Sequence, residues 1–370
     1  MTVFRRLIPG LLAAATALWF AQPALSDDSI AQAKPLKKVR IAVGTTNLNV
    51  GYPWLTLPLD LGYWKDEGYD VEVLPVGASL QALQQMVAGN AEFAQLNSSV
   101  VIQANVVNDI PARVVMNNGV IDWSISVLDQ GPIKDVKDLK GKTVGVFSLA
   151  TGGVFFMKSY FRASGMDPEK DVGMVAVGLG APPVDALQTN KVQGLLFWAA
   201  AQATFENAGL KLRYLIGPDW RTYPDFTFST LKKTIDSDPA MVEAIARGAA
   251  KASEFVFANP DCARQLHWKY WPSTKPTGAD EATLIKADMK NQQAQLDSMR
   301  DAHAMNGGKL WGNATPEAYG RIQRFMLEAK QIEKELPPQT YMNGIPGLYE
   351  KINNFDANAV RAQAASCPVQ

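Results

Sequence analysis

The sequence predicts an α/β fold built from two similar units. With 370 residues, 47% of them hydrophobic, the chain is long and apolar enough for two ordinary domains with their own cores. From Lys38 onward, short runs rich in β-branched residues alternate with helical stretches, the pattern typical of βα units around a mainly parallel sheet. The order changes near residue 123, after which a second series repeats the architecture of the first.

The first unit is expected to contain four strands with helices between them. Each expected strand is a short apolar or alternating run, and each expected helix carries apolar residues near helical spacing. Gly68 and Gly89 stand where two of these helices should end, and Ser79 is placed to cap one of them. The expected strands cover residues 39–43, 70–76, 92–96 and 113–116, and the expected helices cover residues 54–67, 80–88 and 101–107.

The second unit follows the same rules. A turn signal at residues 129–132, Asp-Gln-Gly-Pro, separates its first strand from the rest. Beyond Thr227 the sequence becomes largely helical. The expected strands cover residues 123–128, 143–146, 173–177 and 192–197, and the expected helices cover residues 154–164, 184–189, 200–208, 240–257, 282–302 and 316–335.

Residues 1–26 have the form of a secretory signal peptide. Two arginines near the start precede an apolar run at residues 11–21, and small residues follow at 24–26. A second small-residue site at residues 31–33 leaves cleavage after residue 26 or after residue 33 open. The apolar run is shorter than the roughly 20 residues that span a bilayer, which argues against a membrane anchor. The segment therefore predicts export, most simply to a bacterial periplasm.

Composition excludes several classes of function. Lysine plus arginine and aspartate plus glutamate each total 36, which argues against a general nucleic-acid binder. The two histidines, His267 and His303, form no readable catalytic or metal arrangement, so no catalytic residue, metal or cofactor is predicted. The glycines of residues 178–181 lack the third glycine of a dinucleotide loop. Cys262 and Cys367 are compatible with one disulfide that holds the carboxy-terminal tail, or with two free thiols.

Two segments carry a resemblance to a known family. They are GYWKDEGYDVEVLPVGASLQALQQMVAGNAEFAQLNSSVVIQA, residues 62–104, and DVKDLKGKTVGV, residues 135–146. The chain resembles the solute-binding proteins of ABC transporters for nitrate, sulfonates, taurine and thiamine precursors. The resemblance covers residues 38–350 and is weak over residues 282–302.

This resemblance implies a two-lobed periplasmic binding protein of type II with a two-strand hinge and a ligand in the cleft. The crossings between lobes are expected near residues 124–128 and 226–230. Lobe 1 is then expected over residues 37–125 and 229–345, lobe 2 over residues 126–228, and a carboxy-terminal tail over residues 346–370.

Loops rich in small polar residues follow the expected strands, where ligands bind in open α/β sheets. Several of these loops stand at helix starts, where free backbone N–H groups favour a ligand group that is anionic or a strong hydrogen-bond acceptor. The alternative for each Ser, Thr or Asn is that its side chain caps its own helix. Trp54 and Trp198 are the first candidates for walls that stack on a planar ligand, with core packing as the alternative. The predicted ligand-binding residues are Thr45, Thr46, Asn47, Trp54, Ser79, Asn97, Ser98, Asn117, Thr151, Gly152 and Trp198.

The predicted function is capture of a small organic anion, of sulfonate or aromatic carboxylate type, for delivery to an ABC permease and its ATPase in the inner membrane. Binding of a pyrimidine or thiamine precursor, or presentation of ligand to a membrane sensor, remains an alternative. A pyrimidine-synthase-like enzyme is disfavoured, because such enzymes resemble this chain in lobe architecture but carry a cysteine-rich motif and a reactive histidine. The protein is expected to act as a monomer without nucleic acid.

Overall fold

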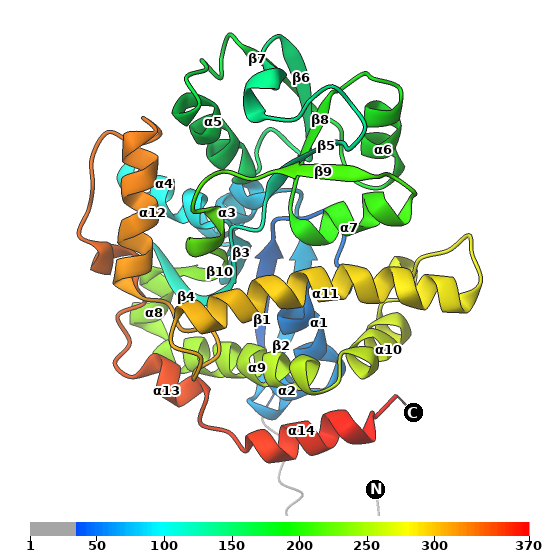
Figure 1. Ribbon diagram of the computed structural model, residues 1–370. Helices are drawn as coiled ribbons and strands as arrows, with labels where there is room; N and C mark the ends of the chain where they lie inside the picture. The colour runs from blue at the N-terminus through cyan, green and yellow to red at the C-terminus, as the bar shows by residue number, and fades with distance from the viewer. Residues whose placement is uncertain (1–34, 370) are drawn as a thin grey trace, which may run out of the picture. The chain divides into compact units, whose positions relative to one another are not determined.

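The computed structural model describes residues 35–369, and the expected signal peptide lies outside the described residues. Two five-stranded sheets organise this part of the chain (Figure 1). The first sheet has a parallel core of three strands and two further strands paired antiparallel at one side. In spatial order its strands are β2 (Tyr69–Pro75), β1 (Lys37–Val43), β3 (Phe93–Leu96), β10 (Pro224–Leu231) and β4 (Ala112–Val120).

The second sheet repeats this arrangement. Its core is also three parallel strands, and an antiparallel strand again lies between the third parallel strand and the last one. In spatial order its strands are β7 (Val172–Ala176), β6 (Lys142–Val146), β8 (Gly194–Phe197), β5 (Ser124–Leu128) and β9 (Leu212–Leu215).

The antiparallel strand of each sheet is the one that arrives from the other sheet. The chain leaves β4 at Val120 and enters the second sheet as β5, and it leaves β9 and returns to the first sheet as β10. The α/β class predicted from the sequence is therefore confirmed. The crossings, however, lie earlier than the expected residues 124–128 and 226–230: the first occupies residues 121–123 and the return ends before Pro224.

The physical reason is that β10 is fully buried between two partners. Thr227 donates from its hydroxyl to Leu96 O on β3 at 3.1 Å, and Thr230 donates to Glu92 O at 2.6 Å. All eight residues of β10 are buried, so this polar-looking segment is a central strand whose hydroxyl groups are hydrogen-bonded inside the first sheet. Residues 224–228, expected in lobe 2, belong to the first sheet.

Helices surround both sheets, and the carboxy-terminal ones pack mainly on the first. None of the helices within residues 35–369 combines the length and apolar character needed to cross a membrane. The helices are α1 (Pro53–Asp60), α2 (Tyr63–Asp66), α3 (Ser79–Val87), α4 (Ser98–Val106), α5 (Gly153–Ala163), α6 (Ala181–Gln188), α7 (Ala199–Asn207), α8 (Lys232–Ser237), α9 (Pro239–Ala258), α10 (Pro260–Tyr270), α11 (Glu281–Met305), α12 (Pro316–Glu328), α13 (Leu348–Ile352) and α14 (Ala357–Ser366), with 3₁₀ turns η1 (Val136–Leu139), η2 (Trp220–Thr222), η3 (Pro272–Thr274) and η4 (Pro338–Tyr341).

Three elements differ from the expected ones. The helix expected over residues 54–67 is two helices, because Gly62 adopts φ +76° and ends the first one. The helix expected over residues 316–335 ends at Glu328. The short strand β9 carries no clear alternation of apolar and polar residues, and the sequence did not predict it.

The core of the first lobe depends on a close helix approach. Trp64 is fully buried and donates from Nε1 to Ile245 O of α9 at 2.9 Å. A Cβ atom on Gly248 would lie 2.3 Å from that indole nitrogen. Glycine at position 248 therefore lets α9 pack against the tryptophan ring without overlap.

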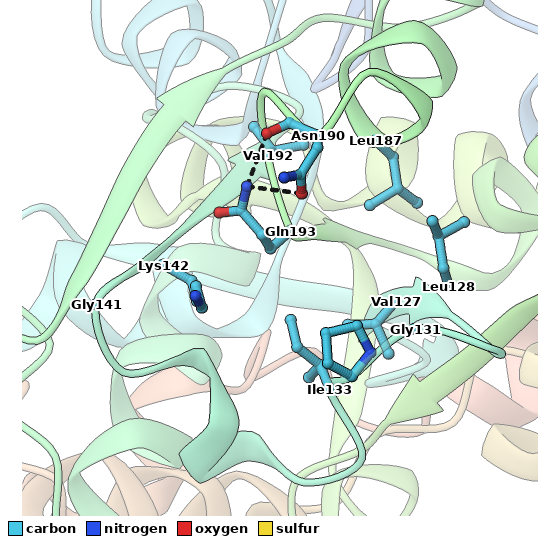
Figure 2. A pocket seen from close by; sticks show the side chains of 11 residues that line it. Val127, Leu128, Gly131, Ile133, Gly141, Lys142, Leu187, Asn190, Val192 and Gln193 are labelled. Atoms are coloured by element: carbon cyan, nitrogen blue, oxygen red, sulfur yellow. Dashed lines mark hydrogen bonds between the residues drawn. The ribbon is translucent and has the colours of Figure 1, made fainter.

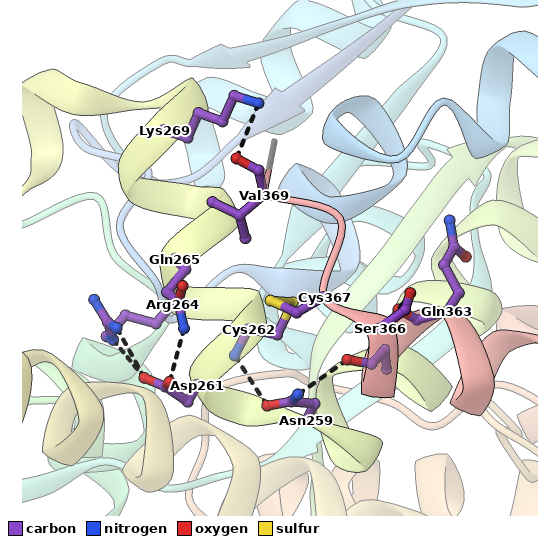
Figure 3. Close-up of a disulfide and its surroundings, with 11 residues drawn as sticks. Asn259, Asp261, Cys262, Arg264, Gln265, Lys269, Gln363, Ser366, Cys367 and Val369 are labelled. Carbon is purple, nitrogen blue, oxygen red and sulfur yellow. Dashed lines mark hydrogen bonds and ion pairs between the residues drawn. A yellow bond between two sulfur atoms is a disulfide. The ribbon is translucent and has the colours of Figure 1, made fainter.

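A disulfide between Cys262 and Cys367 ties the carboxy-terminal tail to α10 (Figure 3). Beside it, Asn259 accepts a hydrogen bond from Cys262 N at 3.0 Å and donates from Nδ2 to Ala364 O at 2.9 Å. Of the two alternatives for these cysteines, the structure shows the bonded one. The tail, which contains α13 and α14, is thus fastened to the start of α10 by the disulfide at Cys367 and by the Asn259 hydrogen bond to Ala364.

Replacing both cysteines with alanine is expected to lower the free energy of unfolding by about 2–4 kcal/mol, because the bridge closes a long loop in the unfolded chain. The two cysteines are 105 residues apart in the sequence. Urea unfolding of the oxidised protein, the reduced protein and the variant checks this. The reduced protein should match the variant, and equal midpoints for all three would contradict the prediction.

Candidate functional site

A buried hydrogen-bond network joins three of the predicted ligand-binding residues. Ser79, at the start of α3, donates from Oγ to Asn97 Oδ1 at 2.8 Å, and its Oγ accepts from Asn97 N at 3.1 Å. Asn97 donates from Nδ2 to Asp225 Oδ2 at 2.8 Å, and Ser98 N donates to Asp225 Oδ1 at 2.8 Å. The loops after β2 and β3 are therefore locked to β10 by a carboxylate that the sequence analysis did not single out.

The same network extends to the second sheet. Gly152, just before α5, donates from N to Asn97 Oδ1 at 3.2 Å, and Ser99 donates from Oγ to Gly152 O at 3.3 Å. A Cβ atom on Gly152 would lie 2.4 Å from Asn97 Cβ, and one on Gly153 would lie 2.3 Å from the Trp123 ring. The glycine pair thus allows the loop of one sheet to touch the other, at the carboxyl ends of β3 and β6.

The remaining small polar residues of the prediction are placed differently. Thr45 is buried and makes a local turn, donating from Oγ1 to Asn47 O at 3.0 Å, whereas Thr46 and Asn47 are exposed. Asn117 is buried on β4, and its amide nitrogen donates to Asp225 O at 2.8 Å. Thr151 is buried next to the glycine pair. Thr45, Asn117 and Thr151 are thus buried in the segments that surround the network.

The two tryptophans predicted as walls are buried on opposite sheets. Trp54, on α1, packs edge-on against Phe226 of the first sheet, with ring centroids 6.2 Å apart. Trp198, at the end of β8, packs on Trp123 at 5.4 Å and on Phe147 at 5.6 Å. Since Trp123 lies in the first crossing, its ring connects the aromatic cluster of the second sheet to the hinge.

Asp122, in the first crossing, is the second carboxylate that the sequence analysis missed. It is 2% exposed, and within residues 35–369 neither of its carboxylate oxygens has a hydrogen-bond partner. A signal for both carboxylates was present in the sequence. Asp122 and Asp225 are single acidic residues inside runs that are otherwise apolar or hydroxyl-bearing, and buried acids are rare without a specific role.

Burial dominates the electrostatics of these two carboxylates. Burial raises the pKa of Asp122 to about 8, the nearby guanidinium of Arg221 opposes the rise, and the charge of Asp225 adds to it. Burial also raises the pKa of Asp225 to about 6, although the Ser98 N–H and the Asn97 amide favour its charged form. The smaller rise at Asp225 follows from its hydrogen bonds.

Arg221 joins the two crossings. Its Nη1 donates to Ile121 O and, at 3.1 Å, to Trp123 O, so the return segment is bonded to both neighbours of Asp122. Ile121 N also donates to Tyr223 O at 3.0 Å. The two crossing segments therefore run side by side, as a two-strand hinge requires.

A separate pocket lies within the second lobe, away from these residues (Figure 2). It has a volume of about 360 Å³ and lies between the end of β5 with the turn that follows it, the start of β6 and the end of α6. Its central amide is already paired: Gln193 donates from Nε2 to Asn190 O at 2.8 Å and accepts from Thr143 N at 3.0 Å. The pocket shares no residue with the predicted site.

Comparisons with known proteins agree with this geometry. A family model described as NMT1/THI5 like matches residues 56–263, more than half of the chain. The chain belongs to the NMT1/THI5-like family. The family resemblance noted from residues 62–104 and 135–146 is therefore confirmed. No curated protein matches this NMT1/THI5-like chain.

Solved structures show the fold of this NMT1/THI5-like protein. A protein from Bordetella bronchiseptica RB50 is similar with a TM-score of 0.65 and 18% identity, over 85% of this chain and 96% of that one. The periplasmic aliphatic sulphonate binding protein SsuA from Escherichia coli matches with a TM-score of 0.54 and 14% identity, over 83% and 92%. The desulfurization enzyme DSZB matches with a TM-score of 0.52 and 13% identity, over 86% and 99%. The predicted periplasmic-binding-protein fold is confirmed.

The buried carboxyl of Asp122 should make stability fall as the pH rises. The pKa of this carboxyl is about 8 in the folded protein and has an ordinary value of 3.8. The folded protein therefore binds the proton more tightly than the unfolded chain. The resulting contribution to the free energy of unfolding is complete below pH 3.8 and is lost as the pH rises to 8. The free energy of unfolding of the parent protein should therefore fall between pH 5 and pH 8 by about 2–4 kcal/mol more than that of Asp122→Asn.

Urea unfolding at the two pH values measures the difference, with Asp185→Asn as the matched control because Asp185 is exposed on α6. The same pH dependence in Asp122→Asn and in the parent protein would contradict the prediction.

Proposed function

We propose that this chain is an exported solute-binding protein that captures a small organic molecule between its two lobes. The contact of Gly152 with Asn97 supports this most directly, because it brings together the loops at the carboxyl ends of strands from both sheets. Ligands of open α/β sheets bind at these ends, and hinge closure around a ligand is the usual motion of such folds. Delivery to an ABC permease and its ATPase, action in the periplasm and a monomeric state complete the proposal.

The proposed ligand has an aromatic or apolar body and an acidic group. In this proposal the indole rings of Trp54 and Trp198, one from each lobe and both buried, contact the body of the ligand. The small polar loops at residues 44–47, 77–79, 97–99, 117–118 and 148–153 contain no lysine or arginine. Sulfonates and aromatic carboxylates fit this surface better than a bare, highly charged anion. The sulphonate that the Escherichia coli protein binds supports the same class. A pyrimidine or thiamine precursor remains the second candidate, since a planar ring would stack in the same way.

Catalysis is the rival class, because one structural neighbour is a desulfurization enzyme. Three features of this chain favour binding instead. His267 stacks on Trp271, and burial lowers its pKa to about 4. His303 stacks on Trp311 with centroids 4.2 Å apart. Both cysteines are joined in a disulfide, so neither is a free nucleophile.

A thermal-shift screen of the purified protein against sulfonates, aromatic carboxylates, pyrimidines and nitrate tests the proposal. A ligand at 100 times its dissociation constant should stabilise the fold by about 2.7 kcal/mol, seen as a shift of a few degrees. The protein is unfolded and refolded before the screen so that a ligand retained from the host is removed. Absence of any shift after refolding would count against capture of these classes.

Trp198→Ala should weaken binding of the best ligand at least tenfold while the protein stays folded, because the variant loses one indole wall. Titration calorimetry measures the affinity and circular dichroism checks the fold. Trp268→Ala is the matched control, since Trp268 of α10 packs between Arg264 of the same helix and Lys275, which follows η3. Unchanged affinity in Trp198→Ala would remove this residue from the site.

A further inference from the structure

The pocket of the second lobe lies at the opposite end of its sheet from the residues that join the lobes (Figure 2). The loop that carries Gly152 follows the carboxyl end of β6, whereas the pocket is lined by Lys142, the first residue of that strand. Its volume of about 360 Å³ falls within the range of roughly 300–1,000 Å³ that is typical of small-molecule sites. The pocket is therefore a second candidate binding site.

The walls of this pocket are aliphatic. Ile133, Leu187 and Val192 line it although each is at most 5% exposed to solvent. Val127 and Leu128 add the end of β5. Among the described residues that line the pocket none is aromatic, so a ligand ring would find no stacking partner there. An aliphatic chain suits this surface, since burying it removes apolar area from water.

One amide at the edge of the pocket is held in place by its neighbour. Gln193 donates from Nε2 to Asn190 O at 2.8 Å and to Asn190 Oδ1 at 3.1 Å, as the dashed lines of Figure 2 show. Because Oδ1 is bonded, the orientation of the Asn190 amide is fixed. Within residues 35–369 its Nδ2 has no hydrogen-bond partner. Asn190 is exposed, so this Nδ2 is a donor available to a ligand.

The edge of the pocket also carries an unpaired positive charge. Lys142 is exposed, and its ammonium group makes no ion pair with any residue of the described chain. The acidic side chains of neighbouring segments are engaged elsewhere. Asp129 pairs with Arg213 at 3.2 Å. Asp171 pairs with Lys140 at 3.3 Å. None of the described residues that line the pocket is acidic, so its edge favours a negatively charged group.

The side-chain acceptors of the pocket are already used. Gln193 Oε1 accepts from Thr143 N at 3.0 Å, and Asn190 Oδ1 accepts from Gln193 Nε2. Donors at Lys142 and Asn190 therefore remain free while the side-chain acceptors do not. A ligand that fits this edge must supply acceptor atoms, which a carboxylate does and an ammonium group does not.

We propose that this pocket binds an aliphatic monocarboxylate of medium chain length. Its carboxylate accepts from the Lys142 ammonium and from Asn190 Nδ2, and its chain lies on the aliphatic walls. Hydrogen bonds between charged groups are stronger than neutral ones, so the head group determines which class of ligand binds and the chain adds affinity. The proposal goes beyond solute capture between the lobes, because the pocket shares no residue with that site.

Titration calorimetry of the full purified protein, after unfolding and refolding to remove retained molecules, tests the ligand class. The probes are octanoate, 1-octanol and octylammonium, which share a chain and differ in the head group. Octanoate should bind at least tenfold more tightly than the other two. From butanoate to hexanoate to octanoate, each methylene should tighten binding about two- to fourfold. Equal affinity for the three head groups, or no binding of octanoate, would overturn the inference.

Two variants assign the site. Lys142→Glu should weaken octanoate binding at least tenfold, because it reverses the charge at the edge. Asn190→Gly should weaken it about threefold, since glycine keeps the left-handed backbone, φ +58°, and removes only the amide. Lys233→Glu on α8 is the control, because it makes the same charge change at an exposed residue of the first lobe. Unchanged octanoate affinity in Lys142→Glu would overturn the inference.

Trp198→Ala separates this pocket from the site between the lobes. Octanoate is itself an organic acid, and its affinity should be the same in Trp198→Ala as in the parent protein. If Trp198→Ala loses octanoate binding while Lys142→Glu keeps it, octanoate binds between the lobes and the inference is wrong. Failure of octanoate to bind leaves the proposed function intact, because that proposal is tested with sulfonates and aromatic carboxylates.

Discussion

The contact between Asn97 and the start of α5 is the constraint on which the arrangement of the two lobes depends. One side-chain oxygen accepts from Ser79 and from the Gly152 backbone, while the amide nitrogen of the same residue donates to Asp225. A single asparagine therefore links the loop after β2, the return strand β10 and the second sheet. Because the groups are buried, each lost partner would leave an unpaired polar atom, which costs about 1–3 kcal/mol. Closure of the lobes is thus coupled to complete pairing of this network.

The hinge is reinforced by elements that join the lobes on either side of the crossings. Arg221 bonds the return segment to the first crossing. On one side α11 packs on both β4 and α7, and on another Arg162 of α5 donates to Ala329 O at the end of α12. Opening of the lobes would have to break these contacts, so the free energy of closure does not come from the cleft alone. A ligand then needs to supply only the part of the free energy of closure that these contacts do not provide.

The sequence predicted the fold class because hydrophobic periodicity and turn residues are local signals. It identified Ser79, Asn97, Ser98 and Gly152, which the structure brings into one network, because each stands just after a strand or just before a helix. It did not find Asp225 and misplaced the return crossing. The run PDFTFST alternates polar and apolar residues, which is typical of a half-exposed strand, and the sequence does not show that its hydroxyl groups are hydrogen-bonded to β3. Nor did it find Asp122, since the burial of this carboxyl depends on tertiary packing around the first crossing.

The pairing of polar atoms separates buried groups that hold the two lobes together from buried groups that do not. Within residues 35–369, the side chains of Ser79 and Asn97 have partners in the protein, so they contribute to closure whether or not a ligand is bound. The carboxylate oxygens of Asp122 have no such partners in the same range. Burying them costs stability in the free protein, which is the physical reason that the pKa of this carboxyl is raised.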